Sequence, residues 1–244
     1  MGTDNLAGTP ADTPAGSLAD VLAGAAAVLF DFDGPLCDVF AAHPAPRVAR
    51  ALARVSAERR PALGTELTGV DDPLEVLRLV HAADPELGLE AERALTAAEV
   101  EAVGAAGGPT PGAVAALEAV RAAGLKIAVV SDHSADCVHA FLDRYDLSPH
   151  VLEVVGRVAR QPDLMRPNPY ALITAAGLLG VDVTLCALVG ASVADVEAAH
   201  AVGSAAIGFA DEPRKLEALT SAGAESVTAS MAALADAVRP RHPG

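Results

Sequence analysis

Short apolar runs separated by segments of helical character extend along most of this chain, and this alternation is the strongest constraint on its fold. The runs lie at residues 25–32, 125–130, 151–155, 185–189 and 205–209. An apolar run of this length predicts a strand that is covered on both faces, as in a parallel sheet. Because alternating strands and helices form βαβ units, the sequence predicts an α/β fold with a parallel sheet.

The region between residues 36 and 111 contains no run that resembles a buried strand. Three segments there have helical character: 47–60, 73–83 and 89–103. We therefore expect an all-helical cap domain at 37–106, inserted into a core domain that consists of 25–36 and 107–244. Ligands of parallel sheets bind beyond the carboxyl ends of the strands, so such an insertion is placed to roof the site.

The first 24 residues are rich in Gly, Thr, Pro, Asp and Ala and lack the basic start of a signal peptide. We expect residues 1–24 to form a disordered leader. No stretch approaches the roughly 20 apolar residues of a membrane span. The three cysteines, Cys37, Cys137 and Cys186, form no C-x-x-C pair, which favours reduced thiols and a cytoplasmic location.

The charge of the chain restricts its partners. Lys and Arg number 17 against 32 Asp and Glu, a formal net charge of −15. Such a chain repels phosphate backbones and anionic lipids, so we expect it to bind neither nucleic acid nor membranes. A small anionic substrate is still allowed, because a bound cation can invert the local field. We expect a small-molecule partner and a monomer or a homodimer.

Two aspartates end the first predicted strand, in the segment DFDGPLCD. Because side chains alternate along a strand, Asp31 and Asp33 are expected on the same side at its carboxyl end. Two carboxylates there are costly unless a cation or hydrogen bonds stabilise them. One can attack an electrophile while the other moves a proton. The alternative is a polar strand end at which Asp33 and Gly34 only start a turn.

Three further polar residues follow predicted strands. Ser131 ends the second strand, and its hydroxyl and N–H can hold a phosphate oxygen, although an ordinary helix cap fits equally well. Arg166, in MRPNPY, can clamp an anion or simply carry a solvated charge. Asp195 falls in the first turn of a predicted helix, where a carboxylate is favourable in any case. Their shared position, each beyond a buried strand, points to a single site.

These segments together resemble the haloacid dehalogenase-like superfamily, in its phosphatase branch with a small helical cap, similar to phosphoglycolate phosphatases. The matching segments are VLFDFDGPLCD (28–38), 129–131, MRPNPY (165–170) and LVGASVADVEAAHAVG (188–203). The resemblance implies a Rossmann-like core that starts after residue 24. It further implies that Asp31 is the nucleophile, which forms an aspartyl-phosphate, and that Asp33 is the general acid/base.

The resemblance also implies ligands for a metal ion and for the phosphoryl group. The metal would be Mg²⁺, held by Asp31, the backbone carbonyl of Asp33, and Asp195. The phosphoryl group would be bound by Ser131, Asp132 and Arg166. The presence of Asp33 argues against the dehalogenase branch, which lacks this acid/base.

Several positions depart from the family pattern. In place of G-D-S-x-x-D the chain has GASVAD, so Ala191 removes an acidic metal ligand. Arg166 stands in place of the usual lysine, and its planar fork makes the exchange non-conservative. Asp132 is an additional carboxylate that is repulsive beside a phosphate unless it pairs with His133 or Arg166.

The resemblance with these departures predicts Mg²⁺-assisted hydrolysis of a small phosphomonoester, weakened by the missing ligand at Ala191. The alternative is a catalytically impaired relative that binds a phosphorylated metabolite or a protein partner. Sugar phosphates, phosphoglycolate-like acids and nucleotides all stay open as substrates.

Two other sites fit the residues less well. GASVA resembles a nucleophile elbow at Ser192, but its last position is alanine and only Asp236 and His242 follow as partners. A metal site of His133, Cys137 and His139 is a further possibility, but position 139 leaves the helix face that 133 and 137 share. We expect a polar helix surface there instead.

Overall fold

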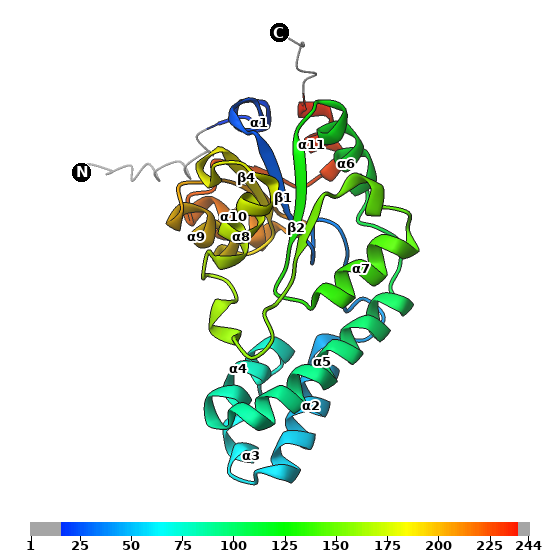
Figure 1. Ribbon diagram of the computed structural model, residues 1–244, viewed down its shortest axis with the longest axis vertical. Helices are drawn as coiled ribbons and strands as arrows, with labels where there is room; N and C mark the ends of the chain where they lie inside the picture. The colour runs from blue at the N-terminus through cyan, green and yellow to red at the C-terminus, as the bar shows by residue number, and fades with distance from the viewer. Residues whose placement is uncertain (1–15, 239–244) are drawn as a thin grey trace, which may run out of the picture.

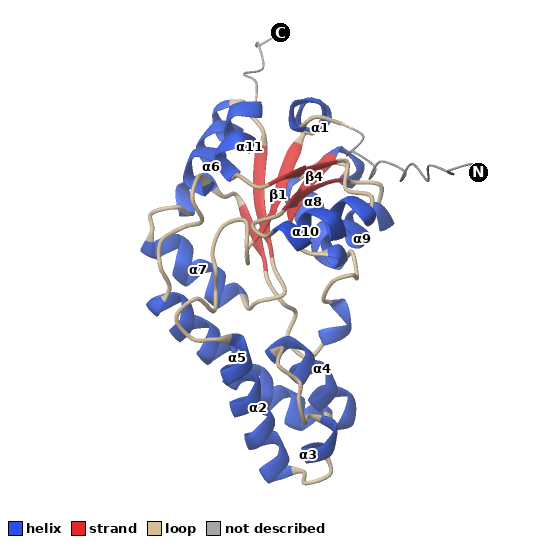
Figure 2. Ribbon diagram, turned by 180° about the vertical axis from the view of Figure 1, so that it is seen from behind, coloured by secondary structure: helices blue, strands red, loops and turns tan. Residues whose placement is uncertain are grey.

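A computed structural model of the chain describes residues 16–238 and has a parallel sheet of six strands at its centre (Figures 1 and 2). The strands lie in the order β3-β2-β1-β4-β5-β6. Their bounds are β1 Ala27–Asp31, β2 Lys126–Val130, β3 Glu153–Val155, β4 Cys186–Gly190, β5 Ala205–Phe209 and β6 Ser226–Thr228. The predicted Rossmann-like α/β fold is confirmed, and β6 is a short sixth strand that the apolar runs did not predict.

Strand β1 lies in the middle of the sheet, between β2 and β4. All five of its residues are buried, because both of its faces are covered. Val28 and Phe30 belong to one apolar core, while Ala27 and Leu29 belong to the core on the opposite face. This is the physical reason for the unbroken apolar run: burying each large side chain stabilises the fold by about 1.5–3 kcal/mol.

Helices cover the sheet on both sides. The core around Phe30 is completed by α1 (Leu18–Gly24), α6 (Ala113–Ala122), α7 (Ala135–Arg144) and α11 (Met231–Ala237). The core around Leu29 is completed by α8 (Tyr170–Leu179), α9 (Val193–Ala201) and α10 (Pro213–Ser221). The sheet and these helices form the upper part of the molecule in Figure 1.

The expectation of a disordered leader over 1–24 is wrong for its last part, and residues 1–15 lie outside the described residues. Helix α1 begins with a capping box, in which the Asp20 N–H donates to Ser17 Oγ at 3.2 Å. Its Leu22 is buried in the sheet core. The signal was present in the sequence, since serine followed by an acidic residue three positions later is typical of a helix start.

Between residues 45 and 105, the structure contains helices and turns and no strand. This region contains α2 (Ala45–Arg59), α3 (Leu63–Glu66), α4 (Pro73–Ala83) and α5 (Pro85–Ala105). These helices enclose an apolar core of their own and extend away from the sheet (Figure 2). Helix α5 belongs to both parts, because Leu95 lies in the helical core and Val103 in the core of the sheet. The domain boundaries at 37 and 106 stay predictions.

The remaining expectations concern cysteines and membranes. Cys37, Cys137 and Cys186 are all buried free thiols. Among residues 16–238, no helix has the length and apolarity that a membrane crossing requires.

Candidate active site

The site lies where three neighbouring strands end. Asp31 is the last residue of β1, Ser131 directly follows β2, and Gly190 is the last residue of β4. Because β1 pairs in parallel with both β2 and β4, these ends meet at one edge of the sheet. Asp31 therefore occupies the centre of the edge at which parallel sheets bind ligands.

The Asp31 carboxylate is buried and held through one of its oxygens. Its Oδ1 accepts hydrogen bonds from the Phe32 N–H at 2.8 Å and from Arg166 Nη2 at 2.8 Å. Within residues 16–238, Oδ2 accepts no hydrogen bond. Burial raises the pKa of Asp31 to about 8, although Arg166 acts to lower it. The side chain has the position of a nucleophile and one oxygen that accepts no hydrogen bond from the described residues, and its ionised, attacking form gains population as the pH approaches 8.

Arg166 lies among three carboxylates. Besides Asp31, its Nη1 pairs with Asp195 Oδ1, and its Nε pairs with Asp132 Oδ2 at 3.3 Å. The Arg166 backbone N–H also donates to Asp132 Oδ1, at 3.1 Å. Burial alone would lower the pKa of Arg166, but the carboxylates hold it well above its ordinary value. The predicted pairing of Asp132 is thus with Arg166 and not with His133.

The Asp195 side chain forms hydrogen bonds at the start of its own helix, α9. Its Oδ2 accepts three hydrogen bonds, from the Ala191 N–H at 3.0 Å, the Ser192 N–H at 2.9 Å and Ser192 Oγ at 2.7 Å. Its Oδ1 pairs with Arg166. Gly190 is required for this packing, because a Cβ at that position would lie 2.4 Å from the Asp195 Cβ. Ser192 acts as a helix cap, and His242, its possible partner in an elbow site, lies outside the described residues.

The backbone N–H of Ser131 does not have the phosphate-binding role that the sequence predicted. This N–H donates to the Val155 carbonyl at 2.9 Å, where it extends the pairing of β2 with β3. The N–H is therefore not available to a phosphate oxygen. The hydroxyl accepts from the His133 N–H at 3.0 Å and can still donate its own proton. The cap of the following helix is Ser134, which accepts from the Cys137 N–H.

Asp33 lies beyond the end of β1, in a turn that continues through Gly34 at φ +102°. Its Oδ1 accepts from the Val39 N–H at 3.0 Å, and its Oδ2 lies 3.6 Å from His133 Nε2. Burial acts to raise the pKa of Asp33, but the adjacent His133 outweighs it and lowers the pKa below its ordinary value. The side chain remains 45% exposed. Asp33 therefore both starts a turn and presents an accessible carboxylate.

The His133 ring bridges Asp33 and a buried glutamate that the sequence did not single out. His133 Nδ1 lies 3.0 Å from Glu99 Oε1, and Glu99 Oε2 accepts from the Ser134 N–H at 3.0 Å. Burial lowers the pKa of His133, but the two carboxylates outweigh it and raise the pKa to about 9. Burial acts in the opposite sense on Glu99, and its charged partners lower the pKa of Glu99 to about 2.

The network continues through Arg157, which follows β3. Arg157 donates from Nη1 to Glu99 Oε1 at 2.7 Å and from Nε to Glu92 Oε1 at 2.6 Å. The signal for this network was the spacing of Glu92 and Glu99 in α5. Both glutamates fall on the buried stripe that also contains Leu95 and Ala102. Charged residues in such a stripe need buried partners.

The geometry does not fit the Mg²⁺ site that the resemblance implies. Residues 16–238 contain no group of three or more His, Cys, Asp or Glu arranged to hold a metal ion. Both oxygens of Asp195 are already occupied, and Arg166 lies between Asp195 and Asp31. Ala191 lies close to Gly34 in this site, since a Cβ built on Gly34 would lie 2.8 Å from the Ala191 Cβ. The methyl side chain of Ala191 offers no oxygen to a metal ion. His133, Cys137 and His139 likewise form no such metal-binding group in the described residues.

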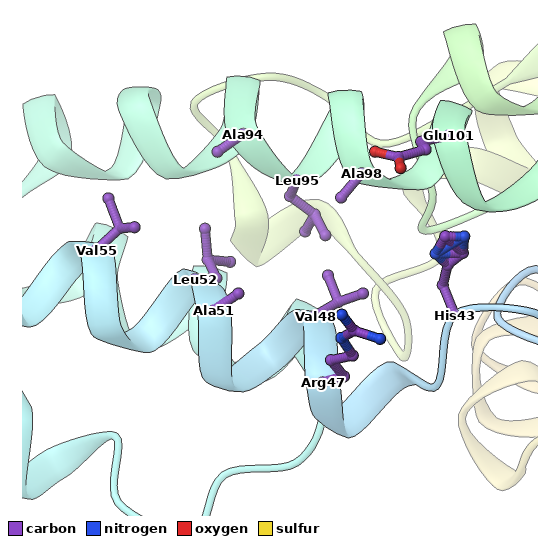
Figure 3. A pocket seen from close by; sticks show the side chains of 10 residues that line it. All are labelled: His43, Arg47, Val48, Ala51, Leu52, Val55, Ala94, Leu95, Ala98 and Glu101. Carbon is purple, nitrogen blue, oxygen red and sulfur yellow. The ribbon is translucent and has the colours of Figure 1, made fainter.

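Two cavities lie near these elements. One, of about 620 Å³, is lined by Asp33, Gly34, Thr110, Lys215 and the loops after β5 and β6. The other, of about 350 Å³, lies between α2 and α5 (Figure 3). Its walls are mostly apolar, and His43, Arg47 and Glu101 lie together at one end. Only the first cavity reaches a residue of the predicted site, namely Asp33.

Comparisons with known proteins identify the family and the fold of the chain. A family model described as haloacid dehalogenase-like hydrolase matches residues 25–203. No curated protein matches the chain.

Solved structures show the same fold. β-Phosphoglucomutase from Clostridium difficile is 17% identical, with a TM-score of 0.62 over 85% of this chain and 92% of that chain. A predicted phosphoglycolate phosphatase from Haemophilus somnus is 17% identical, with a TM-score of 0.62 over 88% and 99%. An HAD family hydrolase from Deinococcus radiodurans R1, with bound phosphate and sodium, is 25% identical, with a TM-score of 0.57 over 90% and 100%.

Proposed function

The chain belongs to the haloacid dehalogenase-like hydrolases, and from this premise we propose that it hydrolyses a small phosphomonoester through an aspartyl-phosphate on Asp31. One observation carries the proposal: a buried carboxylate at the end of the central strand has one oxygen held by Arg166 and by the Phe32 N–H, and in the described residues its other oxygen accepts no hydrogen bond. The names of the similar structures support it, since one is a phosphatase by its description and another holds phosphate.

In the first half of the reaction, Asp31 Oδ2 attacks the phosphorus atom, and the bond from phosphorus to the leaving oxygen breaks. Asp33 gives a proton to that oxygen, which leaves as the alcohol. In the second half, a water molecule attacks the phosphorus atom while Asp33 takes its proton. Phosphate leaves, and the Asp31 carboxylate is regenerated.

The charges around Asp33 influence the choice of leaving group. Because the pKa of Asp33 is below its ordinary value, its protonated fraction near neutral pH is small. Leaving groups that need little protonation are then favoured, which means phenolic rather than alkyl esters. The base form that the second half needs is correspondingly well populated.

Arg166 supplies the positive charge in this scheme. A guanidinium has five N–H donors, and three of them face Asp31, Asp132 and Asp195. Two donors are left for phosphoryl oxygens, together with the hydroxyl of Ser131. Because the residues do not fit a Mg²⁺ site, no step is assigned to that ion.

The test is hydrolysis of a generic aryl phosphate by the purified chain, compared with Asp31→Asn. We expect turnover in the wild type and only background in the variant. The matched control is Asp136→Asn, which changes an exposed aspartate in the first turn of α7 and should keep wild-type turnover. Equal turnover in the wild type and Asp31→Asn would refute the assignment of the nucleophile.

A second candidate is an impaired relative that binds a phosphorylated metabolite without hydrolysing it. The missing acidic side chain at Ala191 favours this candidate. It predicts no turnover of any aryl or alkyl phosphate, together with saturable binding of inorganic phosphate in calorimetry. Substitution of Ser131 by alanine should weaken that binding.

A further inference from the structure

The guanidinium of Arg166 is held in place by three ion pairs. Its three nitrogens contact Asp31, Asp132 and Asp195, and it is almost completely buried. Its backbone is fixed as well, because the N–H donates to Asp132 and the carbonyl accepts from Arg78 Nη2 at 3.1 Å. One positive charge therefore sits permanently among three carboxylates.

The same carboxylates are those that a divalent cation would need. Mg²⁺ requires oxygens at about 2.0–2.1 Å in octahedral geometry. Asp195 has no oxygen to offer, since Oδ2 accepts three hydrogen bonds and Oδ1 pairs with Arg166. A second cation beside the guanidinium would also be repelled, and in a buried site this repulsion is screened little by solvent.

We infer that Arg166 has taken over the place and the charge of the divalent cation, so that this chain neutralises its acidic cluster with its own guanidinium. The two departures from the family pattern at Ala191 and Arg166 are then connected, because together they exchange a metal ion for a side-chain cation. Loss of the carboxylate at Ala191 removes a metal ligand, and exchange of lysine for Arg166 supplies a larger cation that reaches the remaining acidic residues. The fork of arginine suits this role, because it can pair with several carboxylates where a lysine ammonium acts as a point charge.

The consequence is a site that cannot lose its cation. A guanidinium stays protonated at all working pH values, and chelators do not remove it. The role of this charge in catalysis rests on the proposed function, but the replacement itself is a matter of binding. It can therefore be tested without any turnover.

The test is a titration of the purified chain with Mn²⁺ alone, in which free Mn²⁺ is followed by electron paramagnetic resonance. We expect no saturable site in the wild type at roughly millimolar Mn²⁺. In Arg166→Ala the three carboxylates lose their partner, and we expect one site with an affinity at least about tenfold higher. Mn²⁺ should also raise the melting temperature of Arg166→Ala but not that of the wild type.

Arg160→Ala is the matched control, because Arg160 lies in the same connection between β3 and α8 but is exposed and pairs with Glu86. It should behave as the wild type. If Arg166→Ala does not fold, the double variant Arg166→Lys with Ala191→Asp restores the family pattern and should gain the site instead.

Two results would overturn the inference. The first is one tight Mn²⁺ site in the wild type that disappears in Asp31→Asn. The second is a failure of both Arg166→Ala and the double variant to bind Mn²⁺ better than the wild type. Absence of aryl phosphatase activity would refute the proposed function alone and leave the Mn²⁺ result unaffected.

Discussion

Replacement of Glu99 by glutamine is the most direct test of the buried charge network. The Glu99 side chain is completely buried and accepts from Arg157 at 2.7 Å and from the Ser134 N–H at 3.0 Å, and it pairs with His133. Glutamine has nearly the same shape but no charge, and its NH₂ group is a donor. In Glu99→Gln this NH₂ group would face another donor whichever way the amide turns.

Two independent estimates give the size of the effect. Loss of one partner of a buried ion pair costs about 3–5 kcal/mol, because the other charge stays buried without compensation. The pKa of Glu99 is about 2 against an ordinary value of 4.5, and this difference corresponds to roughly 3 kcal/mol. For a chain of this size, a loss of 3–5 kcal/mol lowers the melting temperature by about 6–20 °C.

Thermal unfolding followed by circular dichroism measures this change. Glu101→Gln is the matched control, since Glu101 lies two residues further along α5 and is exposed. Its melting temperature should stay within about 2 °C of the wild type. A similarly small change in Glu99→Gln would show that the charge of Glu99 does not hold α5 against the sheet, and the reasoning would be refuted.

Two further predictions concern pH and packing. The pKa of His133 is raised from 6.5 to about 9, so its contribution to stability is complete below pH 6.5 and is lost as the pH rises through 9. The melting temperature should therefore fall between pH 6.5 and 9, and a flat or rising profile would contradict the buried, charged imidazole. Gly190→Ala should lower stability by about 1–3 kcal/mol and reduce turnover, because the new Cβ would displace the Asp195 side chain. Gly177→Ala in α8, where a Cβ meets nothing within 4 Å, should be neutral or stabilising in the same unfolding assay, and equal losses in both variants would contradict the steric argument.

The sequence by itself determined the arrangement of strands and helices. Because β1 is covered on both faces, all of its residues before Asp31 are apolar, and such a run is visible without any knowledge of its partners. The position of Asp31 followed in the same way, since a carboxylate that ends such a run must lie at the edge of the sheet. The short strand β6 escaped notice because two of its three residues, Ser226 and Thr228, are polar and form no apolar run.

Only the tertiary structure decided which charges meet. Arg166 reaches Asp195 across 29 positions, and Arg157 reaches Glu92 across 65. Asp132 could pair with His133 or with Arg166 as far as the sequence shows, and the fold brings it to Arg166. The physical reason is that the energy of an ion pair depends on distance and burial, and neither quantity is a property of one segment. Local patterns determine the elements, while the choice of cation for Asp31 depends on how those elements pack.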